Sequence, residues 1–382
     1  MPVPAVARAR VVDVAVIGAG VIGLSIAWRL KRAGHSVLII DPDPGSGASF
    51  AAAGMLAPVT EFHFQEQALQ EQLLRSAALW PGFASQLDAD IGYCAQGTLL
   101  LGVDAADRRA LVELMAAQSE LGVPTQAVSS RELRSQEPFL AAGLSGHFVP
   151  GDHQVDPRKL CMALLAGLDL VRHRALRLSP GKVHLEDGSS VLAEQVVVAN
   201  GVAAAELLGP SLAPRLRPVH GDILRLSVPG ELSPLLSHTV RALVRGSSVY
   251  LVPRQDGSLV IGASQREDAS SLPSAGAVYA LLRDAQALLP AVAELALNEV
   301  TARARPATVD NAPLLGRVSE QVLLATGFFR HGVLLAPLAA EISLQLLTGD
   351  PAATPLGFRP QRFREKQGDG RRSPLLDRGT GR

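Results

Sequence analysis

The stretch Gly18-Ala19-Gly20-Val21-Ile22-Gly23 decides the fold of this chain, because it matches the pattern G-x-G-x-x-G in suitable surroundings. Residues 11–17 before it are rich in valine and apolar except for Asp13, which predicts a buried parallel strand. Residues 21–33 after it have the apolar spacing of a helix, and Gly34 would cap its C-terminus. The sequence therefore predicts the start of a Rossmann-like unit that binds a dinucleotide.

Each glycine of this stretch has a physical role in such a unit. Gly18 permits the tight turn, Gly20 lets the backbone approach a pyrophosphate, and Gly23 lets the helix pack close to the strand. The helix N-terminus would offer free N–H groups and a partial positive charge to the phosphates. A second predicted strand, residues 36–40, ends at Asp41, whose carboxylate could accept hydrogen bonds from a ribose. A glycine turn without a ligand is the alternative that this context argues against.

Composition limits the class of protein. The chain has 382 residues, more than one compact core usually holds, so we expect two lobes. Its 36 basic and 36 acidic residues balance, which gives no long-range attraction to nucleic acid or to an anionic membrane. Cys94 and Cys161 lie far apart and outside any metal-ligand spacing, which favours a reducing compartment. Because no signal peptide or membrane span is predicted either, we expect a cytoplasmic protein.

The pattern of elements predicts a mixed fold, an α/β part combined with an α+β part. Apolar strands that suit a parallel sheet come in three separate blocks, and segments with the alternation of an antiparallel sheet lie between them. We therefore predict a discontinuous dinucleotide-binding domain at 1–85, 145–220 and 300–358, which becomes an FAD-binding domain if the resemblance described below holds. It would be interrupted by an antiparallel-sheet substrate-binding domain at 86–144 and 221–299. Residues 359–382 are polar and basic, which predicts a flexible tail.

The motif alone does not choose between FAD and NAD, although its place near the start of the chain favours FAD. Three further stretches make the choice, because they resemble the glycine oxidases of the D-amino-acid-oxidase superfamily. They are residues 47–58 with Ala-Ala-Gly-Met-Leu at 52–56, residues 249–254 with 262–264, and residues 305–316 with 327–337. The resemblance runs from residue 11 to residue 347 in order and spacing.

The resemblance implies non-covalently bound FAD and a set of residues along it. We expect the ADP portion to lie at Val21, Ile22, Asp41 and Pro42, and the adenine at the backbone of Ala175. The pyrophosphate would lie at Ala48 and Ser49, and the flavin ring at Ala53, Gly54 and Met55. The flavin pyrimidine edge would lie at Phe328, Phe329, Arg330, His331, Gly332, Val333 and Leu334. A helix predicted from Gly332 to Leu347 would place its positive end near the charge of reduced flavin. An ordinary packing helix explains the same pattern equally well.

A substrate site follows from the same resemblance and from the chemistry of an amino acid. Arg305 would bind the substrate carboxylate, since a guanidinium can do so with two parallel hydrogen bonds. Tyr250 would add a phenolic hydrogen bond, and Arg330 would face the amino group. Arg303 lies two residues before Arg305, so the register of the carboxylate partner stays open.

The implied activity is oxidative deamination of glycine or another small amino acid by FAD. The products would be an imine or 2-oxo acid, ammonia and hydrogen peroxide, with molecular oxygen as acceptor and thiamin thiazole synthesis as the pathway. Ser248 and Gln265 depart from the family's pocket and leave the substrate's size open. A D-amino-acid or sarcosine-type oxidase, a quinone-linked dehydrogenase and a flavin-free binding protein are the alternatives. The resemblance also implies a homo-oligomer such as a tetramer. We expect no metal, because His153, His220 and His331 lack the spacing of metal ligands.

Overall fold

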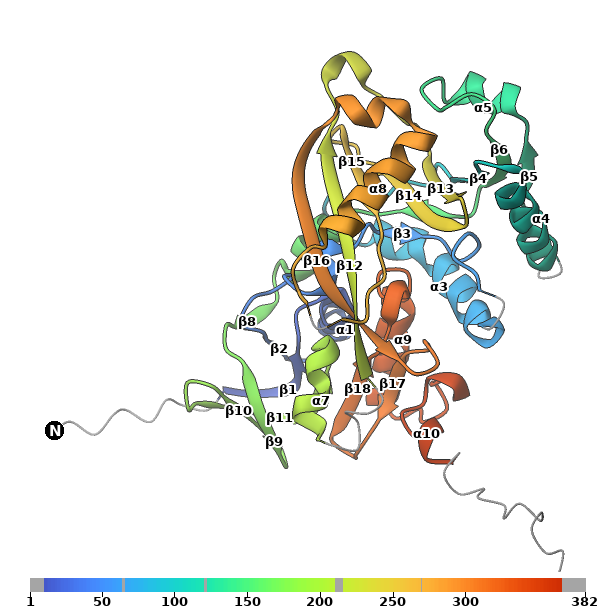
Figure 1. Cartoon of the computed structure of the whole chain (residues 1–382). Coiled ribbons are helices and arrows are strands. Elements are labelled where there is room, and N and C mark those ends of the chain that lie inside the picture. The colour runs from blue at the N-terminus through green and yellow to red at the C-terminus, as the bar shows by residue number, and fades with distance from the viewer. Residues whose placement is uncertain (1–9, 64–65, 120–121, 210–215, 269, 366–382) are drawn as a thin grey trace, which may run out of the picture.

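The computed structural model describes residues 10–63, 66–119, 122–209, 216–268 and 270–365. Two large sheets organise these residues (Figure 1). One sheet lies with its helices in the lower half of the view, and the other lies in the upper half with helix α8 (Ala275–Leu288). Two long strands, β12 (Leu216–Ser227) and β16 (Ala296–Thr308), extend from the upper half toward the lower one.

The lower sheet contains the predicted dinucleotide-binding unit. Its main strands run in the order β17-β18-β11-β1-β2-β8, and β9 and β10 continue from β11 as an antiparallel meander. Their bounds are β1 (Arg10–Ile17), β2 (Val37–Ile40), β8 (Asp169–Val171), β9 (Ala175–Ser179), β10 (Lys182–Leu185), β11 (Ser190–Val198), β17 (Leu314–Arg317) and β18 (Val322–Thr326). Strand β1 is parallel to both β2 and β11. The predicted strand–helix–strand opening and the α/β fold class are thus confirmed.

Helices cover this sheet because its central strands are apolar on both faces. Along β1, Val14 and Val16 belong to one buried cluster, and Ala15 and Ile17 belong to another on the opposite face. This explains why residues 14–17 of the strand are continuously apolar instead of alternating. The helices outside the upper sheet are α1 (Val21–Arg32), α2 (Ala48–Ala51), α3 (Gln67–Ser85), α6 (Pro157–Leu165), α7 (Ala204–Leu208), α9 (Ala336–Leu347) and α10 (Arg362–Glu365).

The upper sheet runs in the order β16-β12-β15-β14-β13-β4-β6-β5 and is antiparallel except between β4 and β13. Its remaining strands are β4 (Thr98–Gly102), β5 (Gln126–Val128), β6 (Ser145–Val149), β13 (Thr239–Val244), β14 (Ser247–Pro253) and β15 (Ser258–Gly262). Helices α4 (Ala105–Ser119) and α5 (Ser130–Gln136) connect its strands. A third, two-stranded sheet pairs β3 (Met55–Leu56) with β7 (His153–Gln154).

Sheet membership differs from the predicted domain boundaries at three strands. Residues 145–149, 216–220 and 300–308 were assigned to the FAD-binding domain, but they lie in β6, β12 and β16 of the upper sheet. Strand β16 escapes sequence analysis because its partly buried positions carry arginine and glutamate where a core strand would carry apolar residues. The division into two domains itself stays a prediction.

Two further elements begin or end at different residues than the sequence predicts. Helix α9 begins at Ala336 and not at Gly332, with Pro337 in its first turn, where proline is tolerated because the N–H there has no helical partner. At the chain's end, residues 359–365 of the predicted flexible tail include α10, and the Arg362 guanidinium pairs with Asp310. Residues 366–382 lie outside the described part. No helix among the described residues is long and apolar enough to cross a bilayer.

Candidate functional site

A cavity of about 860 Å³ is lined by residues from both large sheets. The glycine turn after β1 contributes to its lining, and so do strands β14 and β16 of the upper sheet. Most of the predicted cofactor and substrate residues line this single cavity. They are Gly18, Gly20, Val21, Ile22, Asp41, Ala48, Ser49, Ala53, Gly54, Met55, Tyr250, Arg305, Phe328, Phe329, Arg330, Gly332 and Val333.

The glycine turn has no room for side chains. Gly18 has a φ of +105°, and a Cβ there would lie 2.6 Å from the backbone of Ala199 on the neighbouring strand. A Cβ on Gly23 would overlap the carbonyl oxygen of Gly18, which explains why this helical position requires glycine. Gly20 is the N-cap of α1, and it leaves open the space in front of the helix N-terminus.

Two side chains hold the segment in front of this turn. The Ser49 hydroxyl is buried and accepts a hydrogen bond from the backbone N–H of Val21 at 2.9 Å. The Asp41 carboxylate accepts from the N–H of Ala19 at 2.6 Å and from the N–H of Asp43 at 2.8 Å. Asp41 therefore holds the turn in shape as well as lining the cavity.

The segment with the Ala-Ala-Gly-Met-Leu sequence is fixed from behind by arginines of the upper sheet. Arg254 donates to the backbone carbonyls of Ala53 and Val155. Arg225 donates to the carbonyl of Phe50 at 3.1 Å. Gly54 has a φ of +72°, and any Cβ there would overlap the carbonyl oxygen of Val155. The backbone of residues 50–54 is therefore rigidly placed along the cavity wall.

The segment 328–334 reaches the cavity only in part. Phe328, Phe329, Arg330, Gly332 and Val333 line it. His331 does not, because its ring is buried, and burial holds its pKa well below the ordinary value. Leu334 does not either, because its carbonyl faces α3 and accepts from the Trp80 indole at 2.9 Å. The guanidinium of Arg330 forms an ion pair with Glu66.

Arg305 and Tyr250 converge on one place at the end of β15. The Arg305 guanidinium donates to the carbonyl of Ser264 at 3.2 Å and lies directly over Gly221, where any Cβ would clash with it. The Tyr250 hydroxyl lies over Gly262, the residue at which β15 ends. Among the described residues, Arg305 has no carboxylate partner and the Tyr250 hydroxyl has no hydrogen-bond partner. The two side chains thus present unsatisfied donors to the cavity.

Electrostatics keeps the Tyr250 phenol protonated. Burial raises the pKa of Tyr250 to about 12, although the nearby cation Arg305 acts in the opposite direction. A neutral phenol and a guanidinium are both hydrogen-bond donors, so this place is suited to an acceptor with negative charge. A carboxylate meets both requirements.

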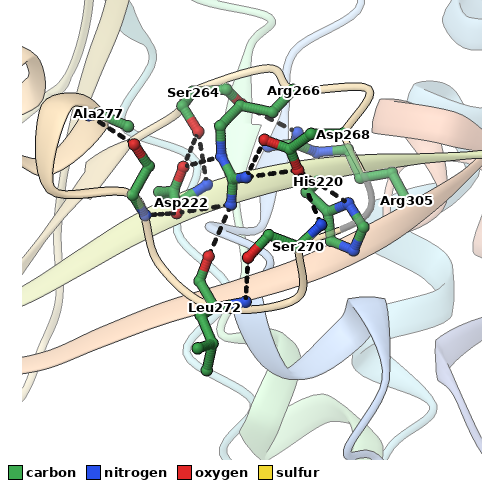
Figure 2. A network of polar contacts seen from close by, with 10 residues as sticks. His220, Asp222, Ser264, Arg266, Asp268, Ser270, Leu272, Ala277 and Arg305 are labelled. Atoms are coloured by element: carbon green, nitrogen blue, oxygen red, sulfur yellow. Dashed lines mark hydrogen bonds and ion pairs between the residues drawn. The ribbon is translucent and has the colours of Figure 1, made fainter.

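A polar network supports Arg305, as Figure 2 shows, and its centre, Asp222 with Arg266, does not itself line the cavity. Asp222 is fully buried, and its carboxylate accepts from the Arg266 guanidinium at 2.9 Å and from the Ser264 hydroxyl. Ser264 in turn accepts from the backbone N–H of Asp222 at 2.8 Å. Since the carbonyl of Ser264 is the acceptor for Arg305, the network fixes the guanidinium through one residue. Arg266 also donates to Asp268 and to the carbonyl of Leu272, so both of these residues are tied to the same centre.

Sequence analysis missed several polar residues that line the cavity, among them Glu61, His63 and Arg241. Glu61 and Arg241 form a largely buried ion pair at 3.0 Å, and His63 lies beside them with its pKa lowered by burial and by Arg330. Arg241 could have been found, because it is the cross-strand partner of Tyr250. Besides His331 and Leu334, three predicted residues have no place in the lining. Gly23 packs inside the turn, Pro42 is exposed, and Ala175 begins β9.

Comparison with known proteins identifies the family. The family model for FAD dependent oxidoreductases (DAO) matches residues 13–346. The chain belongs to this family.

Similarity to individual proteins supports the same family assignment. The chain is 30% identical to a glycine oxidase of Bacillus licheniformis, over 90% of this chain and 94% of the relative. It is 33% identical to a Rhizobium etli protein that carries the name thiamine biosynthesis oxidoreductase ThiO, over 87% and 95% of the two chains. The crystal structure of glycine oxidase from Geobacillus kaustophilus superposes with a TM-score of 0.82 at 32% identity, covering 91% of this chain and 97% of that one. The chain is thus an FAD-dependent oxidoreductase, and its relatives include proteins named glycine oxidase.

The cavity of this oxidoreductase fits FAD on its own geometry. The glycine turn leaves the N-terminus of α1 open where a Cβ would fill it, and the adjoining wall is formed by the small residues at 46–49 and 51–54. The cavity then continues to the unsatisfied donors of Arg305 and Tyr250. A long cofactor with phosphates at one end and a reactive ring at the other suits this arrangement.

Proposed function

We propose that this protein oxidises glycine, or another small amino acid, to the imine, with molecular oxygen as the final electron acceptor. The single observation that carries the proposal is the convergence of Arg305 and Tyr250 in the cavity that begins at the glycine turn. The names of the relatives support glycine as the substrate and thiamin synthesis as the pathway. A cytoplasmic location and assembly of identical subunits belong to the same proposal.

The residues of the chain bind and orient the substrate. Arg305 forms two parallel hydrogen bonds to the carboxylate, while the Tyr250 phenol donates a third. Arg330, which is held by Glu66, lies at the amino side of the bound substrate. The amine must be neutral when the reaction occurs, and an amino acid bound in that form needs no protein base. The cavity's apolar wall around Met55 and Ile223 excludes water from the reacting carbon.

Bound FAD supplies the redox chemistry, since flavin accepts a hydride from the α-carbon. The substrate also loses one proton from nitrogen. Because a hydride is a proton with two electrons, the substrate loses two electrons and two protons in total and leaves as an imine. Water then converts the imine to a 2-oxo acid and ammonia. Oxygen takes up the two electrons and two protons and becomes hydrogen peroxide.

The test is a visible spectrum of the purified protein, recorded without oxygen before and after glycine is added. We expect flavin bands that bleach with glycine, and peroxide when air is readmitted. Bands that bleach with sarcosine or a D-amino acid but not with glycine would keep the reaction class and move specificity to Ser248 and Gln265, which also line the cavity. Bleaching without peroxide would favour a quinone-linked dehydrogenase, and no flavin bands after reconstitution would overturn the proposal.

A further inference from the structure

Two arginines on one strand enter the same cavity and serve different ends of it. Arg303 and Arg305 are two residues apart on β16, so both point to one face of the sheet. Arg305 turns toward the carbonyl of Ser264, on the side of the cavity where Tyr250 lies. Arg303 turns toward the segment in front of the glycine turn, where its Nε donates to the carbonyl of Ser46 at 2.9 Å. The two guanidinium groups therefore cannot be exchanged for one another.

The segment that Arg303 contacts lies against the N-terminus of α1 on both sides of the contact. The backbone N–H of Gly45 donates to the carbonyl of Ala19 at 3.0 Å. The hydroxyl of Ser49 accepts from the N–H of Val21 at 2.9 Å. Ser46 lies between these two connections, so the Arg303 guanidinium is placed at the part of the cavity that the glycine turn opens.

Arg303 also carries a charge that the described residues leave unpaired. Four arginines line the cavity, Arg305 among them; Arg241 pairs with Glu61, and Arg330 pairs with Glu66. Arg303 binds only backbone carbonyls, those of Ser46 and Ala302, and no carboxylate among the described residues. Its carbon Cζ lies 5.5 Å from the centre of the Phe50 ring, which holds the guanidinium in place.

The balance of charge requires such a cation. A diphosphate carries about two negative charges, whereas a helix N-terminus supplies only about half a positive charge. The carboxylates of Asp41 and Asp43 line the same region and add negative potential. We infer that Arg303 binds the diphosphate of FAD and neutralises part of its charge. This role is independent of which amine the enzyme oxidises.

The test compares the affinity of the protein for FAD with its affinity for riboflavin, which lacks the diphosphate. The cofactor is removed from the purified protein, and rebinding is followed by flavin fluorescence. We expect Arg303→Gln to weaken FAD binding by about 10–100-fold, the value of a charge-assisted hydrogen bond, and to leave riboflavin binding unchanged. Arg303→Lys, which keeps the charge, should recover part of the loss. The loss should also shrink as salt is raised, because salt screens the interaction.

Arg158→Gln is the matched control. Arg158 also donates to a carbonyl of this segment, that of Phe50, and also packs on the Phe50 ring, at 3.6 Å, but it does not line the cavity. If Arg303 served only to shape the segment, Arg158→Gln would weaken FAD binding similarly, and Arg303→Gln would weaken FAD and riboflavin alike. Either result would overturn the inference, as would unchanged FAD affinity in Arg303→Gln.

Discussion

The two ends of the cavity are built on different principles. At the cofactor end, a contiguous turn of six residues presents backbone N–H groups, and the critical feature is the absence of side chains at Gly18, Gly20 and Gly23. At the substrate end, Arg305 and Tyr250 come from separate strands and are held by a network of further side chains. The first end depends on local backbone geometry, whereas the second depends on tertiary packing. Substitutions should therefore act as all-or-none changes at the first and as graded changes at the second.

Gly23→Ala tests the cofactor end and has the largest expected effect. The new Cβ would overlap the Gly18 carbonyl, which belongs to the backbone of the turn and cannot move without opening it. We expect the protein to lose FAD during purification, as judged by the ratio of absorbance at 450 nm to that at 280 nm.

Gly34→Ala is the control at the other end of the same helix. Gly34 has a φ of +94° but nothing lies within 4 Å of its Cβ position, so alanine there costs roughly 1–2 kcal/mol in backbone strain without a clash. Thermal unfolding should shift while FAD stays bound. Retention of FAD by Gly23→Ala would show that the turn is more adaptable than the comparison implies.

Arg305→Lys tests the substrate end. Lysine keeps the charge but lacks the planar fork that fits a carboxylate. Because charge-assisted hydrogen bonds contribute about 1.5–3 kcal/mol, kcat/KM for glycine should fall by roughly 10–100-fold. Steady-state peroxide assays measure the loss, and the spectrum of bound flavin should stay unchanged. Full activity in this variant would move the carboxylate site to another residue.

Asp222→Asn tests whether the network around Asp222 positions Arg305. The change removes the buried one of the two carboxylates that pair with the partly buried Arg266 guanidinium, so the Ser264 carbonyl should lose its fixed place. We expect acetate, a simple carboxylate probe, to bind about 10-fold more weakly, which corresponds to about 1.4 kcal/mol. Acetate binding is followed by the change in flavin absorbance.

Asp284→Asn is the control for the loss of a buried ion pair. Asp284 on α8 is also buried and pairs with Arg245 and Arg283, but it does not line the cavity or contact the network. It should lower thermal stability without weakening acetate binding. Equal weakening in both variants would mean that Asp222 acts through general stability.

The same contrast explains what the sequence could predict. The glycine turn, its strand and its helix follow from consecutive residues, because the spacing itself encodes the backbone geometry. Tyr250 and Arg305 depended on family resemblance, since nothing local to either residue marks it as facing a cavity. Arg303 had been considered only as a register alternative to Arg305, and its own direction became visible through its bond to Ser46.

Residues at the substrate end were missed for the same reason. Glu61 and Arg241 are 180 positions apart, and only the packing of β13 beside the segment after β3 brings them together. Strand β16 was missed because a strand that lines a polar cavity lacks the apolar alternation by which strands are recognised. The polar residues that give β16 its place in the cavity are thus the reason why its sequence does not predict a strand.

The Tyr250 hydroxyl gives the smallest and most specific effect. Tyr250→Phe removes one neutral donor, worth about 1 kcal/mol, so acetate affinity should fall by roughly fivefold. The phenol loses its proton only near its pKa of about 12, so it remains a donor at every lower pH. The ratio of wild-type to variant affinity should therefore stay constant from pH 7 to pH 10 in the absorbance titration. If the wild-type advantage disappeared between pH 8 and pH 10, the phenol would be ionising there, and the burial that separates this end of the cavity from solvent would be less complete than the structure indicates.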